Sequence, residues 1–265
     1  MADGPPRIFD HKARALHRAR AAGGDAFLAN EAEAGLEERI GAVMRPFENR
    51  LEFTLDADEH IAAEAGSLDL ITSVLNLHAV NDLPGVLVQA RRALKPDGLF
   101  LAALFGGDTL TELRQSLAAA ELEILGGVSP RVAPFADVRE LGGLLQRAGF
   151  ALPVADVERT VVRYGDFIQL VRDLRAMGET NALVERSRKP MRRDMLAVAV
   201  DHYARHFSDP NGKLRATFDI VYLTGWAPHE SQQQPLKPGS AKSRLAEALG
   251  TKELRSGDAP PKRQT

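Results

Sequence analysis

Residues 68–104 read LDLITSVLNLHAVNDLPGVLVQARRALKPDGLFLAAL, and this stretch decides the fold. Its first part, 68–77, is a nearly continuous apolar run, which is typical of a strand buried on both faces of a parallel sheet. Asn81 or Asp82 can then cap a helix, and after a Pro-Asp-Gly turn residues 99–104 predict a second strand. A strand, a helix and a strand in this order form a βαβ unit.

The rest of the chain repeats this alternation and ends on a late pair of strands. Such an order predicts an α/β three-layer sandwich, with helices on both faces of a mostly parallel sheet. Pro46 should end the helix before it, because proline disfavours helical backbone at the preceding residue. Helices are predicted over 8–22, 26–45, 58–66, 109–125, 137–148, 167–177 and 193–207, and further strands over 51–55, 154–164 and 214–226.

The pattern divides the chain into four parts. We expect an N-terminal helical segment over 1–46 and an α/β domain over 47–228. Residues 229–250 form a C-terminal extension that mixes polar and proline-containing stretches with one short helix. The last part, 251–265, lacks a core-forming pattern and is predicted to be disordered.

Composition limits the classes of function. The net charge of −2 gives no electrostatic footprint for nucleic acid, and the absence of cysteine excludes disulfides, thiolate metal sites and cysteine nucleophiles. No apolar run reaches the eighteen residues that a membrane-spanning helix requires. Residues 7–24 are rich in Arg and Ala, as transit peptides are, but their apolar pattern favours a helix docked on the domain. A cytoplasmic protein is the expectation.

Three segments carry a family resemblance. The stretch LDLITSVLNLHAVNDLPGVLVQARRALKPDGLFLAALFGGDTLTELR at 68–114 resembles the class I S-adenosylmethionine-dependent methyltransferases of type 11. The similar branch includes malonyl-carrier-protein O-methyltransferase and the mitochondrial complex I assembly factor. IFDHKARALHRARAA at 8–22 and LRATFDIVYLTGWAPHESQQQPLKPGSA at 214–241 are similar to the bacterial subgroup near the assembly factor. The resemblance implies a Rossmann-like methyltransferase fold and S-adenosylmethionine as cofactor.

One part of that family pattern is missing. In the family, a glycine-rich turn after the first strand lets the backbone approach the cofactor, because glycine has no Cβ. Here only about twenty residues separate Pro46 from Leu68, whereas a single βαβ unit takes about thirty or more. The first two βα units are therefore largely absent, and the N-terminal half of the sheet should be shortened. LEFTL at 51–55 must stand in for either the first or the third strand.

The resemblance also assigns the candidate cofactor-binding residues. Asp56 and Ala57 match the acidic turn that lies beside the adenine in the family. Leu75, Asn76 and His78 match the segment that faces the sulfonium and the substrate. From the residues alone, Asp56 is equally a solvated turn residue, and His78 is more often a histidine at a helix start than a catalytic base. No catalytic residue is assigned.

A metal site is not expected. His202 and His206 lie four residues apart on one predicted helix, which is a spacing that can bind a metal. No third ligand is evident, and HYARH lacks the glutamate of a zinc protease motif. A solvated helix face is the favoured interpretation of this pair.

Two functions of different classes follow. The family implies methyl transfer from S-adenosylmethionine to an unknown substrate, which the branch suggests is a protein. The missing glycine turn favours a non-catalytic assembly or scaffold protein that keeps the fold. Loss of two strands would also expose an apolar edge of the strand at 68–77, so we expect either LEFTL in the slot beside it or a homodimer paired there.

Overall fold

The computed structural model describes residues 7–21, 23–24, 26–55 and 58–233. Contacts divide the chain into two units, residues 1–229 and 230–265, and all elements below belong to the first. Within the described residues, no helix is long and apolar enough to cross a membrane. The predicted extension beyond 233 and the tail at 251–265 lie outside the described residues.

A mixed five-stranded sheet forms the centre of the first unit, in the order β1-β2-β3-β5-β4. The first three strands are parallel, and β5 runs antiparallel to both of its neighbours. The strands are β1 (Arg50–Glu52), β2 (Leu68–Val74), β3 (Leu94–Gly106), β4 (Ala151–Tyr164) and β5 (Leu214–Trp226). The helices are α1 (His11–Ala21), α2 (Phe27–Gly41), α3 (Leu83–Ala93), α4 (Thr111–Leu125), α5 (Val138–Arg147), α6 (Phe167–Ala176) and α7 (Arg193–Phe207), with a 3₁₀ turn at Leu77–Ala79.

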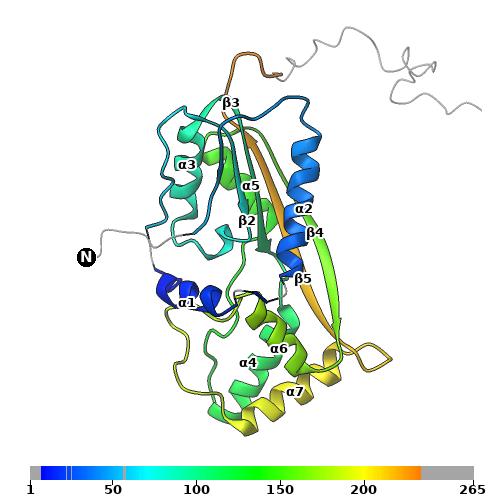
Figure 1. Ribbon diagram of the computed structural model, residues 1–265. Helices are drawn as coiled ribbons and strands as arrows, with labels where there is room; N and C mark the ends of the chain where they lie inside the picture. The colour runs from blue at the N-terminus through cyan, green and yellow to red at the C-terminus, as the bar shows by residue number, and fades with distance from the viewer. Residues whose placement is uncertain (1–6, 22, 25, 56–57, 234–265) are drawn as a thin grey trace, which may run out of the picture. The chain divides into compact units, whose positions relative to one another are not determined.

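Helices cover both faces of the sheet, which confirms the predicted three-layer α/β fold (Figure 1). One face packs on α3 and α5 through residues such as Ile71, Phe100 and Leu223. The opposite face packs on α2, and α4, α6 and α7 extend the core on that side. Because alternate side chains of a strand point to opposite faces, neighbours such as Leu70 and Ile71 belong to different core clusters.

LEFTL does occupy the slot beside β2. Arg50 pairs with Leu70 and Glu52 with Thr72, so β1 covers the edge that would otherwise be bare. The shortened N-terminal half of the sheet is therefore confirmed, with a strand of three residues at its end. A homodimer paired through a bare β2 edge is no longer expected, because β1 of the same chain occupies that position.

Three of the predicted elements have different bounds or are absent in the structure. The helix predicted up to Pro46 ends at Gly41. Segment 58–66 contains no helix, because the carboxylate of Glu59 accepts hydrogen bonds from the backbone N–H groups of Asn81 and Asp82 at 2.6 and 2.8 Å. That segment is therefore tied to the start of α3. The strand predicted over 68–77 ends at Val74.

Candidate functional site

The predicted residues Leu75, Asn76 and His78 lie together at the carboxyl end of β2. In open α/β sheets, ligands bind beyond the carboxyl ends of the strands, so this is the expected place for a site. Asp56 and Ala57 lie outside the described residues, and their assignment to the adenine stays a prediction.

Leu75 adopts a backbone conformation that is rare for a side chain of its kind. Its φ is 45°, in the left-handed region that favours glycine. Its carbonyl oxygen accepts hydrogen bonds from Nη2 of Arg14 at 3.2 Å and Nη2 of Arg18 at 2.7 Å. Both arginines come from α1, four residues apart and hence on one face of that helix. The carbonyl of this residue thus accepts hydrogen bonds from α1.

Asn76 is buried and uses its side chain to connect three segments. Its Oδ1 accepts a hydrogen bond from Nη1 of Arg18 at 2.6 Å. Its Nδ2 donates to the carbonyl of Val74 at 2.8 Å and to that of Phe53 at 3.4 Å. These bonds tie β2, the residues after β1 and α1 together, so the amide is already occupied within the protein.

His78 belongs to a buried cluster with Glu179 and Arg14. Nη1 and Nη2 of Arg14 lie 3.1 and 3.0 Å from the two carboxylate oxygens of Glu179, which is the bidentate geometry that arginine forms best. Nε2 of His78 lies 3.2 Å from Oε2 of Glu179. The His78 ring also packs against Phe105, with ring centroids 5.0 Å apart. Within the described residues, Nδ1 of His78 and Nε of Arg14 are buried without a hydrogen-bond partner.

Burial and charge set the protonation states of this cluster. Burial alone would raise the pKa of Glu179, but the charge of Arg14 and the contact with His78 outweigh it, so the pKa lies well below its ordinary value. Burial lowers the pKa of His78 and outweighs the carboxylate of Glu179, which raises it, while the charges of Arg14 and Arg18 lower it further. At neutral pH we therefore expect an ionised Glu179 paired with Arg14, beside a neutral His78.

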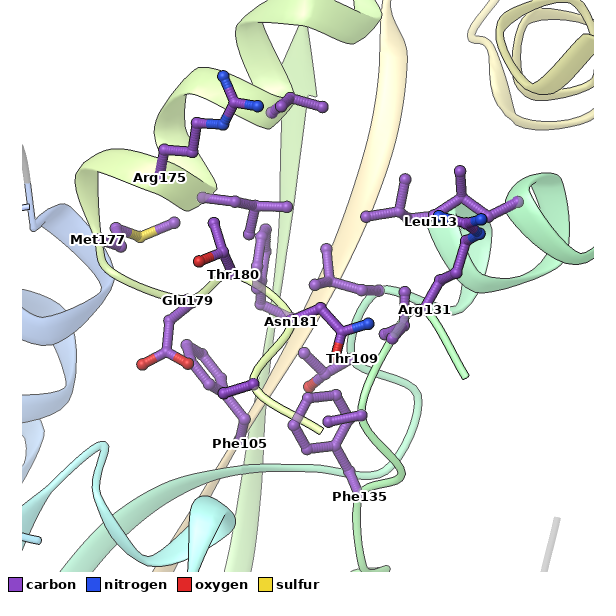
Figure 2. A pocket seen from close by; sticks show the side chains of 18 of the residues that line it. Phe105, Thr109, Leu113, Arg131, Phe135, Arg175, Met177, Glu179, Thr180 and Asn181 are labelled. Atoms are coloured by element: carbon purple, nitrogen blue, oxygen red, sulfur yellow. The ribbon is translucent and has the colours of Figure 1, made fainter. Parts of the chain in front are cut away.

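Two cavities meet at this cluster. The smaller one, of about 430 Å³, lies at the ends of β1 and β2 and is lined by Arg18, Glu33 and Glu52 among others. The larger one, of about 570 Å³, lies on the side of α4 and α6. Glu179 and Phe105 line both cavities. Figure 2 shows the carboxylate of Glu179 beside Phe105 in the larger cavity.

The described residues do not fit S-adenosylmethionine in the way the family pattern requires. No glycine occurs between Gly41 and Gly66, so no turn after β1 allows a close backbone approach. The Leu75 carbonyl, the Asn76 amide and the His78 ring are bonded to α1 and Glu179 instead.

In the part of the chain that the structure describes, no group of three or more His, Cys, Asp or Glu residues could hold a metal ion. The rings of His202 and His206 lie 4.4 Å apart. Nδ1 of His202 lies 3.2 Å from Oγ of Ser116, which gives this pair a contact with α4.

Sequence reasoning missed Arg14, Arg18 and Glu179. Glu179 lies 165 residues from Arg14 in the chain, and no local pattern connects positions so far apart. One signal was available: Arg14 and Arg18 share a helix face in a segment that is rich in arginine. Two cations on one face of a docked helix require anionic or carbonyl partners on the domain.

The sheet, its two helical layers and the site at the end of β2 define a Rossmann-like α/β protein of the methyltransferase class. A family model described as "Methyltransferase domain" matches residues 11–153, and the chain belongs to this family. S-adenosylmethionine is the cofactor that this membership implies, as the sequence predicts.

Several curated relatives are similar over most of the chain. The mitochondrial arginine-hydroxylase NDUFAF5 of Dictyostelium discoideum is 47% identical over 71% of this chain and 43% of its own length. The human protein of the same name is 44% identical over 69% of this chain and 53% of its own length. The malonyl-[acyl-carrier protein] O-methyltransferase of Laribacter hongkongensis is 38% identical over 68% of this chain and 58% of its own length. The chain spans about half the length of these relatives.

The names of these relatives correct one prediction. The sequence favoured a cytoplasmic protein, but NDUFAF5 of Dictyostelium discoideum, Danio rerio and Homo sapiens is named as mitochondrial. Cysteine content and the lack of a long apolar run do not distinguish these compartments, which explains the error. Among solved structures, the YcgJ protein of Bacillus subtilis is similar with a TM-score of 0.49 and 12% identity, covering 74% of this chain and 99% of its own.

Proposed function

We propose that this chain is a non-catalytic assembly or scaffold protein of the methyltransferase family, which keeps the fold and binds a protein partner. One observation carries the proposal: Arg14, Arg18 and Glu179 occupy the polar groups that should face a cofactor. A buried ionic cluster is costly to open, since removing one charged partner leaves the other uncompensated. The cluster therefore favours a fixed structural surface over a site that opens in every catalytic cycle.

The relatives suggest the setting and the partner. Their name as mitochondrial arginine-hydroxylases supports a mitochondrial location and a protein partner that presents an arginine side chain.

Methyl transfer is the second candidate function, and the smaller cavity favours it. Its volume of about 430 Å³ lies within the ordinary range of small-molecule sites. Glu33 and Glu52 are exposed carboxylates in its wall, and Glu52 ends β1. A carboxylate at the end of a parallel strand can accept hydrogen bonds from ribose hydroxyls.

Calorimetric titration of the purified chain with S-adenosylmethionine and S-adenosylhomocysteine separates the two functions. We expect no binding up to millimolar ligand, by a protein that unfolds cooperatively in urea. Micromolar binding, weakened by Glu52→Gln or Asp56→Ala, would overturn the non-catalytic assignment. Arg18→Ala is the matched variant: it removes the guanidinium from the smaller cavity and tests whether α1 alone excludes the ligand.

A further inference from the structure

The larger cavity has a mostly apolar wall. It lies between α4, α6, the segment 131–135 and the segment 179–182, with a volume of about 570 Å³. Cavities of this size accommodate small organic ligands. Its apolar lining includes Phe105, Leu113, Phe135, Phe167, Val171 and Leu196.

Three polar side chains of the wall are already paired with other parts of the protein. Arg131 donates from Nε and Nη2 to Oε1 of Glu121 at 3.0 and 2.7 Å. Asn181 donates to the Pro130 carbonyl at 2.8 Å, and Glu179 is held by Arg14. A ligand inside the cavity therefore meets a mainly apolar surface, since these three groups have little capacity left for it.

Two charged groups of the wall are different. Arg172 and Arg175 lie three residues apart on α6, both are exposed, and both line the cavity. Among the described residues, neither has an ion pair or a side-chain hydrogen bond. Figure 2 shows the guanidinium of Arg175 pointing away from the carboxylate of Glu179. An apolar cavity with two unpaired cations at its exposed border matches a ligand with an apolar chain and an anionic head.

We propose that this cavity binds a single-chain anionic amphiphile, with its alkyl chain among Phe105, Leu113 and Phe135 and its acidic head at Arg172 and Arg175. The carboxylate of a free fatty acid and the phosphate of a lysophospholipid share this chemistry. The inference goes beyond the proposed function, because it concerns a small ligand of the larger cavity, whereas the proposed function concerns a protein partner.

Calorimetric titration of the full chain with sub-micellar dodecanoate is the test. Dodecanoate should bind at micromolar concentration, and decanoate, two methylenes shorter, about fifteen-fold more weakly, from about four-fold per buried methylene. Dodecyltrimethylammonium, with the same chain and a cationic head, should bind at least ten-fold more weakly than dodecanoate. Dodecanoyl lysophosphatidate distinguishes the sources, since tighter binding than dodecanoate assigns the site to a phospholipid and weaker binding to a free acid.

Variants separate the head from the chain. The double substitution Arg172→Ala and Arg175→Ala should weaken the binding of dodecanoate at least ten-fold and leave the affinity for uncharged dodecanol unchanged. Arg205→Ala is the control, because Arg205 is an exposed arginine of α7 that does not line the cavity. Leu113→Trp should abolish the binding of both dodecanoate and dodecanol, because the larger side chain fills the cavity. No binding of dodecanoate by the cooperatively folded protein, or equal binding of the anionic and cationic amphiphiles, would overturn the proposal.

Discussion

The sheet of this protein is long on one side and short on the other. β5 and β4 contribute 13 and 14 residues, whereas β1 contributes 3. In the long part, the inward side chains of β5 are almost completely buried between helices. In the short part, two of the three β1 residues are exposed, and side-chain hydrogen bonds hold the backbone just before the strand.

Polar contacts replace the missing apolar area in the short part. The Asp69 carboxylate accepts hydrogen bonds from the backbone N–H and the side chain of Asn49 at 2.9 and 3.1 Å, just before β1, and it pairs with Lys95 at 2.9 Å. Arg14 and Arg18 connect α1 to the end of β2. The comparison teaches that a sheet can lose strands when specific polar groups hold the remaining edge. Such groups should respond to charge and pH, while the buried strand β5 should respond to changes in side-chain volume.

The largest expected effect is at Glu179. Glu179→Ala leaves the Arg14 guanidinium buried without its partner and should lower the free energy of unfolding by about 3–5 kcal/mol. Glu179→Gln keeps the shape and should cost less than the alanine variant. Urea denaturation at pH 7 measures both as shifts of the midpoint at constant slope. A loss below about 1 kcal/mol for Glu179→Ala would contradict the claim that polar contacts hold the short part of the sheet. The Arg14 guanidinium would then be solvated in the variant.

Volume should matter most in the long part of the sheet. Leu223→Ala in β5 removes a fully buried side chain and should cost about 3 kcal/mol. Leu51→Ala in β1 removes a half-buried side chain and should cost about 1 kcal/mol. The same denaturation experiment compares them. Equal costs would show that β1 is packed as firmly as β5, against the comparison.

Asp69 gives the short part a dependence on pH. Its hydrogen bonds with Lys95 and with the Asn49 backbone lower its pKa from 3.8 to about 2. Because the folded pKa is the lower one, the stabilisation is fully present above about pH 4 and is lost as the pH falls towards 2. With a discount for its partial exposure, it contributes about 1–2 kcal/mol.

The variant Asp69→Asn isolates this effect. The difference in unfolding free energy between wild type and variant, measured in urea from pH 6 to pH 3, should shrink as the pH falls. Glu179 changes stability in the same direction, but it is present in both proteins and cancels in the difference. Parallel curves over this range would show that Asp69 does not hold the edge of β2.

The same contrast explains what the sequence could predict. The bounds of α7 and β5 agree with the sequence prediction, because their apolar periodicity and the turn between them are local signals. The docking of α1 was predicted from the apolar pattern of Ile8, Phe9 and Leu16. Phe9 is buried against Ala79 and Leu183, but Ile8 and Leu16 are exposed, and arginines of α1 make the polar contacts. Residues 58–66 were predicted to be helical, but Glu59 bonds to the start of α3. Long-range polar pairing has no periodicity, so it escaped the prediction.

The smallest effect concerns helix caps, which should not distinguish the two parts at all. Asp82 caps α3 beside the short part by accepting a hydrogen bond from the Gly85 N–H at 2.9 Å, and Asp166 caps α6 beside the long part through the Gln169 N–H at 2.8 Å. Replacing either with alanine should cost about 1 kcal/mol, and replacing either with serine much less. Thermal and urea unfolding of the four variants measures the costs. Because a cap satisfies only its own helix, the two alanine variants should agree, and a much larger loss at Asp82 would show that weakness in the short part extends from the strand edge into its helices.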